Sequence, residues 1–129
     1  MKEPRWISSS VIHALHEELL ARFGGLSGVR DEGLLDSALG RPHNLFAYGK
    51  PTLFELAAEY AVGIIKNHPF LDGNKRTGFM TAYIFLMVNG MEFSAEEEMV
   101  VTQTRSMAAG EVDGAEYAAW LKSVCTPVK

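Results

Sequence analysis

The chain has 129 residues, of which 47% are hydrophobic and 22% are charged, and its formal net charge is −4. This apolar content, without low-complexity stretches, excludes a disordered protein and predicts one domain over residues 1–129. The negative charge argues against direct nucleic-acid binding, which usually needs a basic face, and the longest apolar run is about half the length of a membrane span.

The first predicted helix follows the serines at positions 8 to 10 and ends at Gly24 and Gly25. His13 and His16 lie on or beside its apolar stripe. Two histidines at this spacing can bind a metal ion, but no third ligand is evident nearby. We therefore interpret both as packed or partly exposed residues.

Asp31 is predicted to cap a short second helix that ends at Arg41 and Pro42, because proline disfavours the helical region for the residue before it. The segment 42–51 is then the one long connection with large apolar side chains. These are Leu45, Phe46 and Tyr48. We expect a small β-hairpin or flap here, with its exposed aromatic residues contacting a ligand or partner. The alternative is that these side chains pack onto the core.

The next helix has apolar residues at helical spacing from Leu53 to Ile65. Thr52 and Glu55 form a capping box at its start. Pro69 biases the preceding residue away from the helical region, so we expect the helix to end near Asn67.

Another helix is predicted from about Asn74 to Gly90, because glycine is favoured just past a helix end. Its stretch 79–88 is almost unbroken in apolar character. We interpret this stretch as the buried central helix of the fold.

The loop between these two helices concentrates polar side chains. They are His68, Asp72, Asn74, Lys75 and Arg76. The amides of residues 73–76 are the unpaired donors of a helix N-terminus, where the dipole favours an anion such as phosphate. Two cations in a first helical turn are locally unfavourable, which suggests that an anion is expected there. A carboxylate beside a phosphate commonly holds Mg²⁺, and an imidazole is the commonest general base.

Each of these residues also has a simpler interpretation. Asp72 or Asn74 is well suited to cap the helix and nothing more. His68 is then an ordinary loop histidine, and Lys75 and Arg76 form a solvated turn. The concentration of five polar residues between two apolar helices favours the functional interpretation.

Two more helices are predicted in the C-terminal third. Ser94 with Glu97 forms a capping box for the first of them, and Asp113 with Glu116 forms another for the last helix. The count is six helices and at most one small hairpin, which predicts an all-α fold. The one cysteine, Cys125, cannot form an internal disulfide and indicates a reduced, cytoplasmic setting.

The segment His68–Arg76 resembles the signature loop of the Fic/Doc superfamily. The Fic form reads His-Pro-Phe-x-(Asp/Glu)-Gly-Asn-Gly-Arg-x-x-Arg. The form of the Doc (death-on-curing) toxins ends in Asn-Lys-Arg-Thr, as residues 74–77 do here. Residues 30–42 are also similar to the second helix of Doc-like proteins. The resemblance implies a compact Fic/Doc-type bundle of about six helices around a buried central helix.

The resemblance implies a role for each loop residue. His68 would take a proton from a target hydroxyl, and Asp72 would hold Mg²⁺ against the phosphates of ATP. Phe70 would be a structural anchor that fixes the loop. The backbone of Gly73 and Asn74 with the Asn74 side chain would line an anion hole.

Two further roles follow from the same resemblance. Lys75 and Arg76 would grip phosphate oxygens. The segment near 43–51 corresponds to the flap that aligns a target peptide by strand pairing.

Two departures from the Fic pattern favour the Doc form. Lys75 replaces the second glycine, and Phe79 replaces the second arginine, which removes a bidentate phosphate clamp. Doc-like enzymes are understood to transfer the γ-phosphoryl group of ATP, and the implied acceptor is a threonine of elongation factor Tu, with arrest of translation. Transfer of AMP to a protein hydroxyl and a non-catalytic nucleotide- or partner-binding module are the alternatives.

The inhibitory helix of Fic proteins, Ser/Thr-x-x-x-Glu-Gly, has no credible match. Gly28 stands four residues before Glu32 in place of the hydroxyl residue, and Met99 follows Glu98 in place of the glycine. A toxin without this inhibitor needs one in trans. We therefore expect an antitoxin protein whose partly disordered helix packs over the active cleft.

Overall fold

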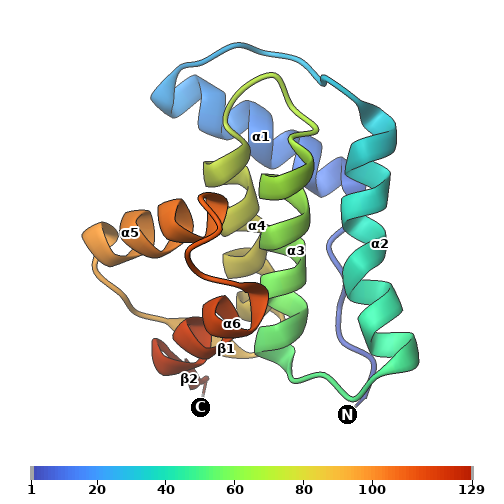
Figure 1. The fold of residues 1–129 in the computed structure, drawn as a ribbon, viewed down its shortest axis with the longest axis vertical. Helices are drawn as coiled ribbons and strands as arrows, with labels where there is room; N and C mark the ends of the chain where they lie inside the picture. Colours follow the sequence, from blue (N-terminus) through green and yellow to red (C-terminus); the bar gives the residue numbers. More distant parts are fainter. Residues whose placement is uncertain (1, 129) are drawn as a thin grey trace.

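The computed structural model describes residues 2–128, and within them the chain forms six helices and one two-stranded antiparallel sheet (Figure 1). In chain order these are α1 (Ser9–Phe23), α2 (Glu32–Tyr48), α3 (Leu53–Asn67), α4 (Asn74–Val88), β1 (Met91–Phe93), α5 (Glu97–Ala108), α6 (Gly114–Ser123) and β2 (Cys125–Pro127). The predicted all-α bundle of about six helices with a small β element is confirmed. Among the described residues, none of the helices combines the length and apolar character of a membrane span.

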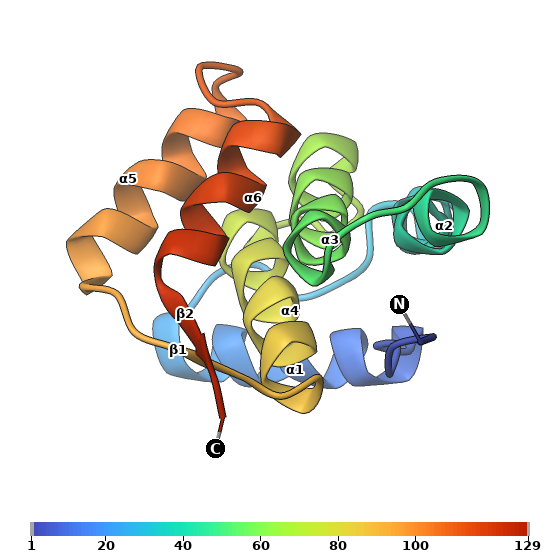
Figure 2. The ribbon, with the colours of Figure 1, turned by 90° about the horizontal axis from the view of Figure 1, so that it is seen from below.

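The central helix of the bundle is α3. Nine of its fifteen residues are buried, and Figure 2 shows it between α2 on one side and α4 and α6 on the other. The expectation that the stretch 79–88 is the buried central helix is therefore wrong, since Met87 and Val88 of α4 remain 50% and 39% exposed.

Two glycines let the neighbouring helices approach α3 closely. A Cβ atom on Gly63 would lie 3.0 Å from the Cβ atom of Ala38 in α2. A Cβ atom on Gly78 would lie 2.7 Å from Cγ1 of Ile65 in α3. The first distance is unusually tight and the second is shorter than real Cβ contacts, so a larger residue at either position would force the neighbouring atoms to shift.

Most predicted helix starts are confirmed by side-chain hydrogen bonds. Ser8 caps α1, Asp31 caps α2, and Asp113 caps α6. The capping box at Ser94 is wrong, because α5 begins after Glu96 and has no side-chain cap. Residue 94 belongs to the connection from β1, where its N–H donates to the backbone oxygen of Val124 at 2.8 Å.

The flap predicted for residues 42–51 is also wrong, because α2 continues through Pro42 to Tyr48. Proline inside a helix costs about 3 kcal/mol through one lost hydrogen bond and a steric clash. Here Pro42 is buried with the apolar face of α2, and the next turn places Leu45 and Phe46 against the core. Burial of this face offsets the cost. Tyr48 is 90% exposed at the helix end.

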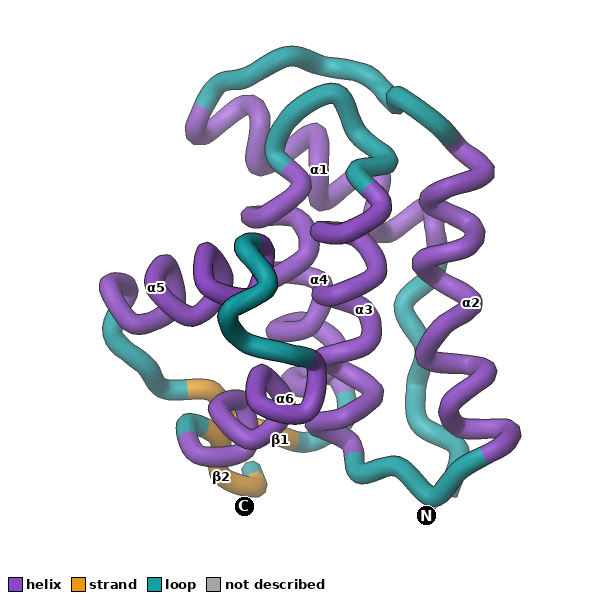
Figure 3. The backbone as a smooth tube through the Cα atoms, viewed as in Figure 1, coloured by secondary structure: helices purple, strands orange, loops and turns teal. Residues whose placement is uncertain are grey.

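The β element lies elsewhere and is not a hairpin. Strand β1 pairs with β2 in the register Met91↔Pro127 and Phe93↔Cys125, with α5 and α6 between them in sequence (Figure 3). This pairing ties the C-terminal segment to the end of α4. The loop between α3 and α4 lies at the opposite end of α4, where it meets the segment between α1 and α2.

Candidate functional site

The loop between α3 and α4 changes direction at two left-handed residues. His68 ends α3 with φ 53° and ψ 54°, and Gly73 precedes α4 with φ 79° and ψ 16°. Pro69 disfavours a right-handed helical conformation for His68. Gly73 has no Cβ atom, so its left-handed conformation causes no steric clash. The predicted helix end near Asn67 and the turn at Gly73 are confirmed. Within residues 2–128, His68 is the one non-glycine residue with positive φ, a kind of backbone outlier that clusters at functional sites.

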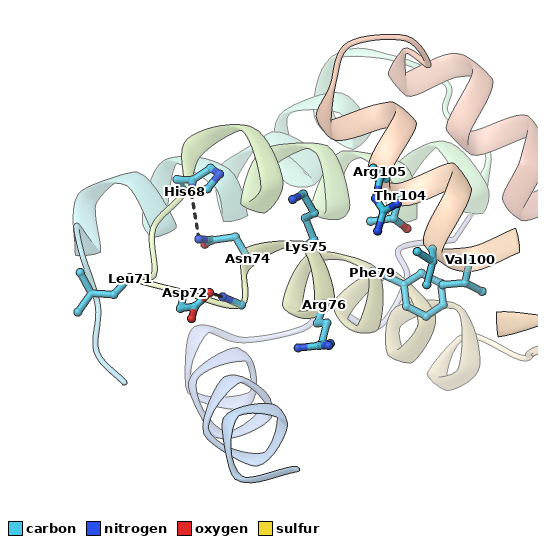
Figure 4. Close-up of a pocket in the computed structure, with 12 residues that line it drawn as sticks. His68, Leu71, Asp72, Asn74, Lys75, Arg76, Phe79, Val100, Thr104 and Arg105 are labelled. Atoms are coloured by element: carbon cyan, nitrogen blue, oxygen red, sulfur yellow. Dashed lines mark hydrogen bonds between the residues drawn. The ribbon is translucent and has the colours of Figure 1, made fainter. Parts of the chain in front are cut away.

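The Asn74 side chain holds the loop closed. Its Oδ1 accepts the N–H of Phe70 at 3.1 Å, and its Nδ2 donates to the Phe70 carbonyl at 2.9 Å and to Nδ1 of His68 at 3.2 Å (Figure 4). Asn74 is only 4% exposed. Both N–H donors of this amide are used inside the loop, so the side chain helps to position His68. The predicted contribution of Asn74 to an anion hole stays a prediction, and the free donor of this residue is its backbone N–H.

Phe70 is buried under the loop at 1% exposure. Its ring stacks on His16 of α1 at 3.9 Å between centroids, and the ring of His13 meets it edge-on at 5.9 Å. The position is that of an anchor between α1 and the loop. The two α1 histidines pack here, and the described residues contain no group of three His, Cys, Asp or Glu side chains suited to a metal ion.

The Asp72 carboxylate accepts hydrogen bonds from the loop itself and from the segment between α1 and α2. Its Oδ1 accepts the N–H of Gly73 at 2.9 Å, and its Oδ2 accepts the N–H of Leu26 at 3.2 Å. The carbonyl of Asp72 accepts Nε2–H of the buried His16 at 2.8 Å. Neither Asp72 nor Asn74 caps α4, so the simpler capping interpretation is wrong. Asp72 is exposed, and each carboxylate oxygen keeps a lone pair for a further ligand.

The N-terminus of α4 is open. Helix α4 has no side-chain cap and no acidic residue in its first turn, and within residues 2–128 the N–H groups of residues 74–76 have no hydrogen-bond partner. Lys75 and Arg76 are both exposed. Arg76 lies with its guanidinium carbon 4.3 Å from the ring centre of Phe23. Such an end favours an anion through both its free donors and its dipole.

A pocket of about 380 Å³ opens over this helix end (Figure 4). The lining residues from the loop and α4 are His68, Leu71, Asp72, Gly73, Asn74, Lys75, Arg76 and Phe79. His68 is exposed at its edge, so the imidazole is not turned into the interior. The structure thus gathers the predicted loop residues at one site, apart from Phe70 beneath it and residues 45, 46 and 48 on α2.

The opposite wall of the pocket comes from α5, which the sequence analysis did not assign to the site. It consists of Val100, Val101, Thr104 and Arg105. The only signal in the sequence is their spacing, since residues 100 and 104 and residues 101 and 105 are helical neighbours on one face. With Asp72 as the one carboxylate against Lys75, Arg76 and Arg105, the pocket is positively charged.

A second element that sequence analysis missed is the segment 24–30, which connects α1 and α2. Val29 forms an antiparallel bridge with Phe70, flanked by hydrogen bonds from Arg30 N–H to the Pro69 carbonyl at 2.7 Å and from Leu71 N–H to the Gly28 carbonyl at 3.1 Å. The loop is therefore paired along one side.

The Arg30 side chain completes this support. Its guanidinium donates to the carbonyl oxygens of His68 at 2.7 Å and Asn67 at 2.8 Å. These are unpaired carbonyls at the C-terminus of α3, so Arg30 satisfies them and helps to fix the backbone of His68.

The exposed histidine of this helical bundle thus lies beside an open, positively charged helix N-terminus, an arrangement that favours an anion. Comparison with known proteins identifies the protein family. Residues 6–86 match the model of the Fic/DOC family. The chain belongs to the Fic/Doc family.

Two curated relatives carry Doc names. The chain is 36% identical to the protein kinase doc of Escherichia phage P1 over 119 residues, which cover 92% of this chain and 94% of that protein. It is 42% identical to the toxin Doc of Mycolicibacterium smegmatis over 78 residues, which cover 57% of this chain and 58% of that protein.

Proposed function

We propose that this protein is a Doc-type toxin that transfers the γ-phosphoryl group of ATP to a protein hydroxyl with the help of Mg²⁺. The observation that carries the proposal is the exposed His68 imidazole at the edge of a pocket whose floor is the uncapped N-terminus of α4. The similarity to a relative named as a protein kinase favours phosphoryl transfer over transfer of AMP.

In this proposal the phosphate chain lies on the α4 end. The free N–H groups of residues 74–76 and the ammonium group of Lys75 bind its oxygens. Positioning and charge neutralisation supply most of the rate enhancement in phosphoryl transfer, and these groups provide both.

Asp72 fits the role of a single protein ligand for Mg²⁺. Its carboxylate is exposed at the pocket and uses one lone pair per oxygen for backbone N–H groups. Mg²⁺ commonly takes one or two carboxylates and completes its shell with water and phosphate oxygens. When bound, the ion would neutralise charge on the phosphate chain.

His68 acts as the general base. Because the Asn74 amide nitrogen can only donate, the neutral imidazole accepts at Nδ1 and carries its proton on Nε2. The target hydroxyl gives its proton to the unprotonated nitrogen of this imidazole. The hydroxyl oxygen then bonds to the γ-phosphorus as the bond to ADP breaks.

The acceptor we propose is a threonine of elongation factor Tu, whose modification would arrest translation. Since residues 43–48 belong to α2 and lie far from the loop, the target segment would align instead along the segment 24–30, which pairs with the loop at Val29. Exposed apolar side chains beside the pocket support a protein substrate: Leu26 is 68% exposed and Leu71 52%. An antitoxin that covers the same cleft is the proposed regulator.

The test is a paired label-transfer experiment. Purified protein is incubated with Mg²⁺, elongation factor Tu and ATP labelled at either the γ- or the α-phosphate. Transfer of the γ label alone supports the proposal. Transfer of the α label would establish AMP transfer instead, and transfer of neither label to elongation factor Tu or to any protein of a cell extract would favour a non-catalytic binding module.

A further inference from the structure

The wall that α5 contributes to the pocket carries one cation, Arg105. We propose that Arg105 is a nucleotide-binding residue that contacts the phosphates which are not transferred. The inference rests on the proposed function and deepens it. Helix α5 lies beyond residue 86, where the match to the family model ends, so the pocket gains this residue from outside the matched span.

The Arg105 side chain has no ion-pair partner among the described residues, so its charge is available to bind an anion. Among residues 2–128 the ion pairs are His13–Glu32, Arg22–Glu18 and Arg41–Glu59, and none involves Arg105. The side chain is exposed, and its neighbours on the α5 wall are Val100, Val101 and Thr104. The Thr104 hydroxyl is taken by a 3.0 Å hydrogen bond with Tyr117. Hence Arg105 is the one group on this wall that can attract an anion.

The other cations of the pocket point in different directions. In Figure 4 Arg105 extends from α5 toward α4 and Lys75 extends from α4 on the same side, whereas Arg76 points to the opposite side. There the Arg76 guanidinium rests on Phe23 of α1. Lys75 and Arg105 therefore face a shared space between α4 and α5.

The order of residues along the pocket indicates where each phosphate of ATP would lie. Figure 4 shows His68 and Asp72 at one end, Phe79, Val100 and Arg105 at the other, and Lys75 between them. The transferred phosphate must lie at the His68 end, because that imidazole takes the proton of the attacking hydroxyl. The phosphates nearer the ribose then extend past Lys75 toward Arg105. A guanidinium suits this role, since its planar fork binds two phosphate oxygens at once.

A purely structural role of Arg105 predicts a different result for its variants. Arg105 lies in the last turn of α5, where a cation stabilises the helix dipole without any ligand. Lys122 also lies in the last turn of its helix, α6, and does not line the pocket, so it is a matched control. A purely structural Arg105 behaves like Lys122 in every assay.

The experiment measures binding of ATP and of inorganic triphosphate by calorimetry in the presence of Mg²⁺, for the wild type and for R105Q, R105K and K122Q. We expect R105Q to weaken both probes about tenfold, which corresponds to about 1.4 kcal/mol. R105K should recover part of the affinity, and K122Q should match the wild type. Thermal unfolding of each variant confirms that it is folded.

Three outcomes would overturn the inference. R105Q that binds both probes like the wild type shows that the side chain does not touch the nucleotide. A loss for ATP without a loss for triphosphate places Arg105 at the base or ribose. If the wild type binds neither probe, the proposed nucleotide site itself is wrong. This result differs from the first two, in which the wild type binds ATP and only the role of Arg105 is wrong.

Discussion

The N-termini of α3 and α4 lie on adjacent helices and are built in opposite ways. Helix α3 begins with a complete capping box, in which Thr52 Oγ1 accepts the Glu55 N–H at 3.1 Å and Glu55 Oε1 accepts the Thr52 N–H at 2.8 Å. Helix α4 follows Gly73, which provides no side-chain cap, and has Lys75 and Arg76 in its first turn. The first end satisfies its own donors, and the second leaves them for a ligand. The open end is costly for the helix alone, and it is the end that we propose binds the phosphates.

Helix α5 shows that a missing cap is not sufficient. It also starts without a side-chain cap, at Glu96, but Glu97 and Glu98 occupy its first turn. Their charges complement the helix dipole and repel a phosphate. The combination of open N–H groups with cations, and a histidine beside them, distinguishes α4.

The largest expected effect concerns the chemistry at the open end. His68→Ala should lower phosphoryl transfer by roughly 10²–10⁴, the usual loss for a general base. Stability and ATP binding should change little, because His68 is exposed and bonds to Asn74 through one long contact. His43→Ala, exposed on α2 and outside the pocket, is the control. An unchanged transfer rate for His68→Ala would contradict the role of His68 as the general base.

The anchor beneath the loop should act on stability instead. Phe70→Ala should lower the free energy of unfolding by about 3–5 kcal/mol, because a fully buried ring is replaced by a cavity. Urea unfolding measures it. Leu71→Ala, the adjacent and 52% exposed residue, serves as the comparison and should stay within about 0.5 kcal/mol of the wild type. Similar losses for the two variants would mean that the loop is not fixed by Phe70.

The wall of the pocket has a buried tyrosine behind it that makes stability depend on alkaline pH. Burial raises the pKa of Tyr117 from 10.0 to about 12, partly opposed by the hydrogen bond with Thr104. The folded state therefore holds this proton more tightly than the unfolded state, and stability is lost as the pH rises from 10 through about 12. The full difference corresponds to roughly 3 kcal/mol.

Tyr117→Phe isolates this contribution. The variant loses some stability at neutral pH, because it leaves the Thr104 hydroxyl without its partner, but its unfolding free energy should fall less steeply above pH 10. Burial also raises the pKa of Tyr60, so part of the loss of stability above pH 10 remains in this variant. Equal slopes for Tyr117→Phe and the wild type would contradict the assignment.

The smallest effect belongs to the capped end. Thr52→Ala should lower the free energy of unfolding by about 1 kcal/mol, the usual loss for an N-cap. ATP affinity should stay at the wild-type value, since α3 starts at the far end from the loop. A parallel loss of ATP affinity would show that the two helix ends are not separate in function.

Local rules make much of this fold predictable from the sequence. Capping residues such as Asp31 and Asp113 act within a few residues, and Pro69 restricts its direct neighbour His68, so their effects need no knowledge of tertiary contacts. The predictions fail where packing decides. Pro42 is expected to stop α2, but burial of the face that contains Leu45 and Phe46 carries the helix through it.

The same distinction holds within the site. The residues of the loop from 68 to 76 are contiguous, so their proximity follows from the sequence alone. The sequence does not reveal that the Asn74 side chain turns inward to Phe70, nor that Arg30 caps the end of α3. Arg105 reaches the pocket from about thirty residues downstream, and only the packing of α5 on α4 brings it there.

The central claim is that the open end of α4 is the cradle of the triphosphate, and backbone amide NMR during titration with ATP and Mg²⁺ tests it most directly. The account predicts that the amide signals of residues 73–76 shift most, with smaller changes at Arg105 and none at Thr52 or at the start of α5. Amides of residues 73–76 that stay in place while those of residues 96–98 or another surface respond would contradict it.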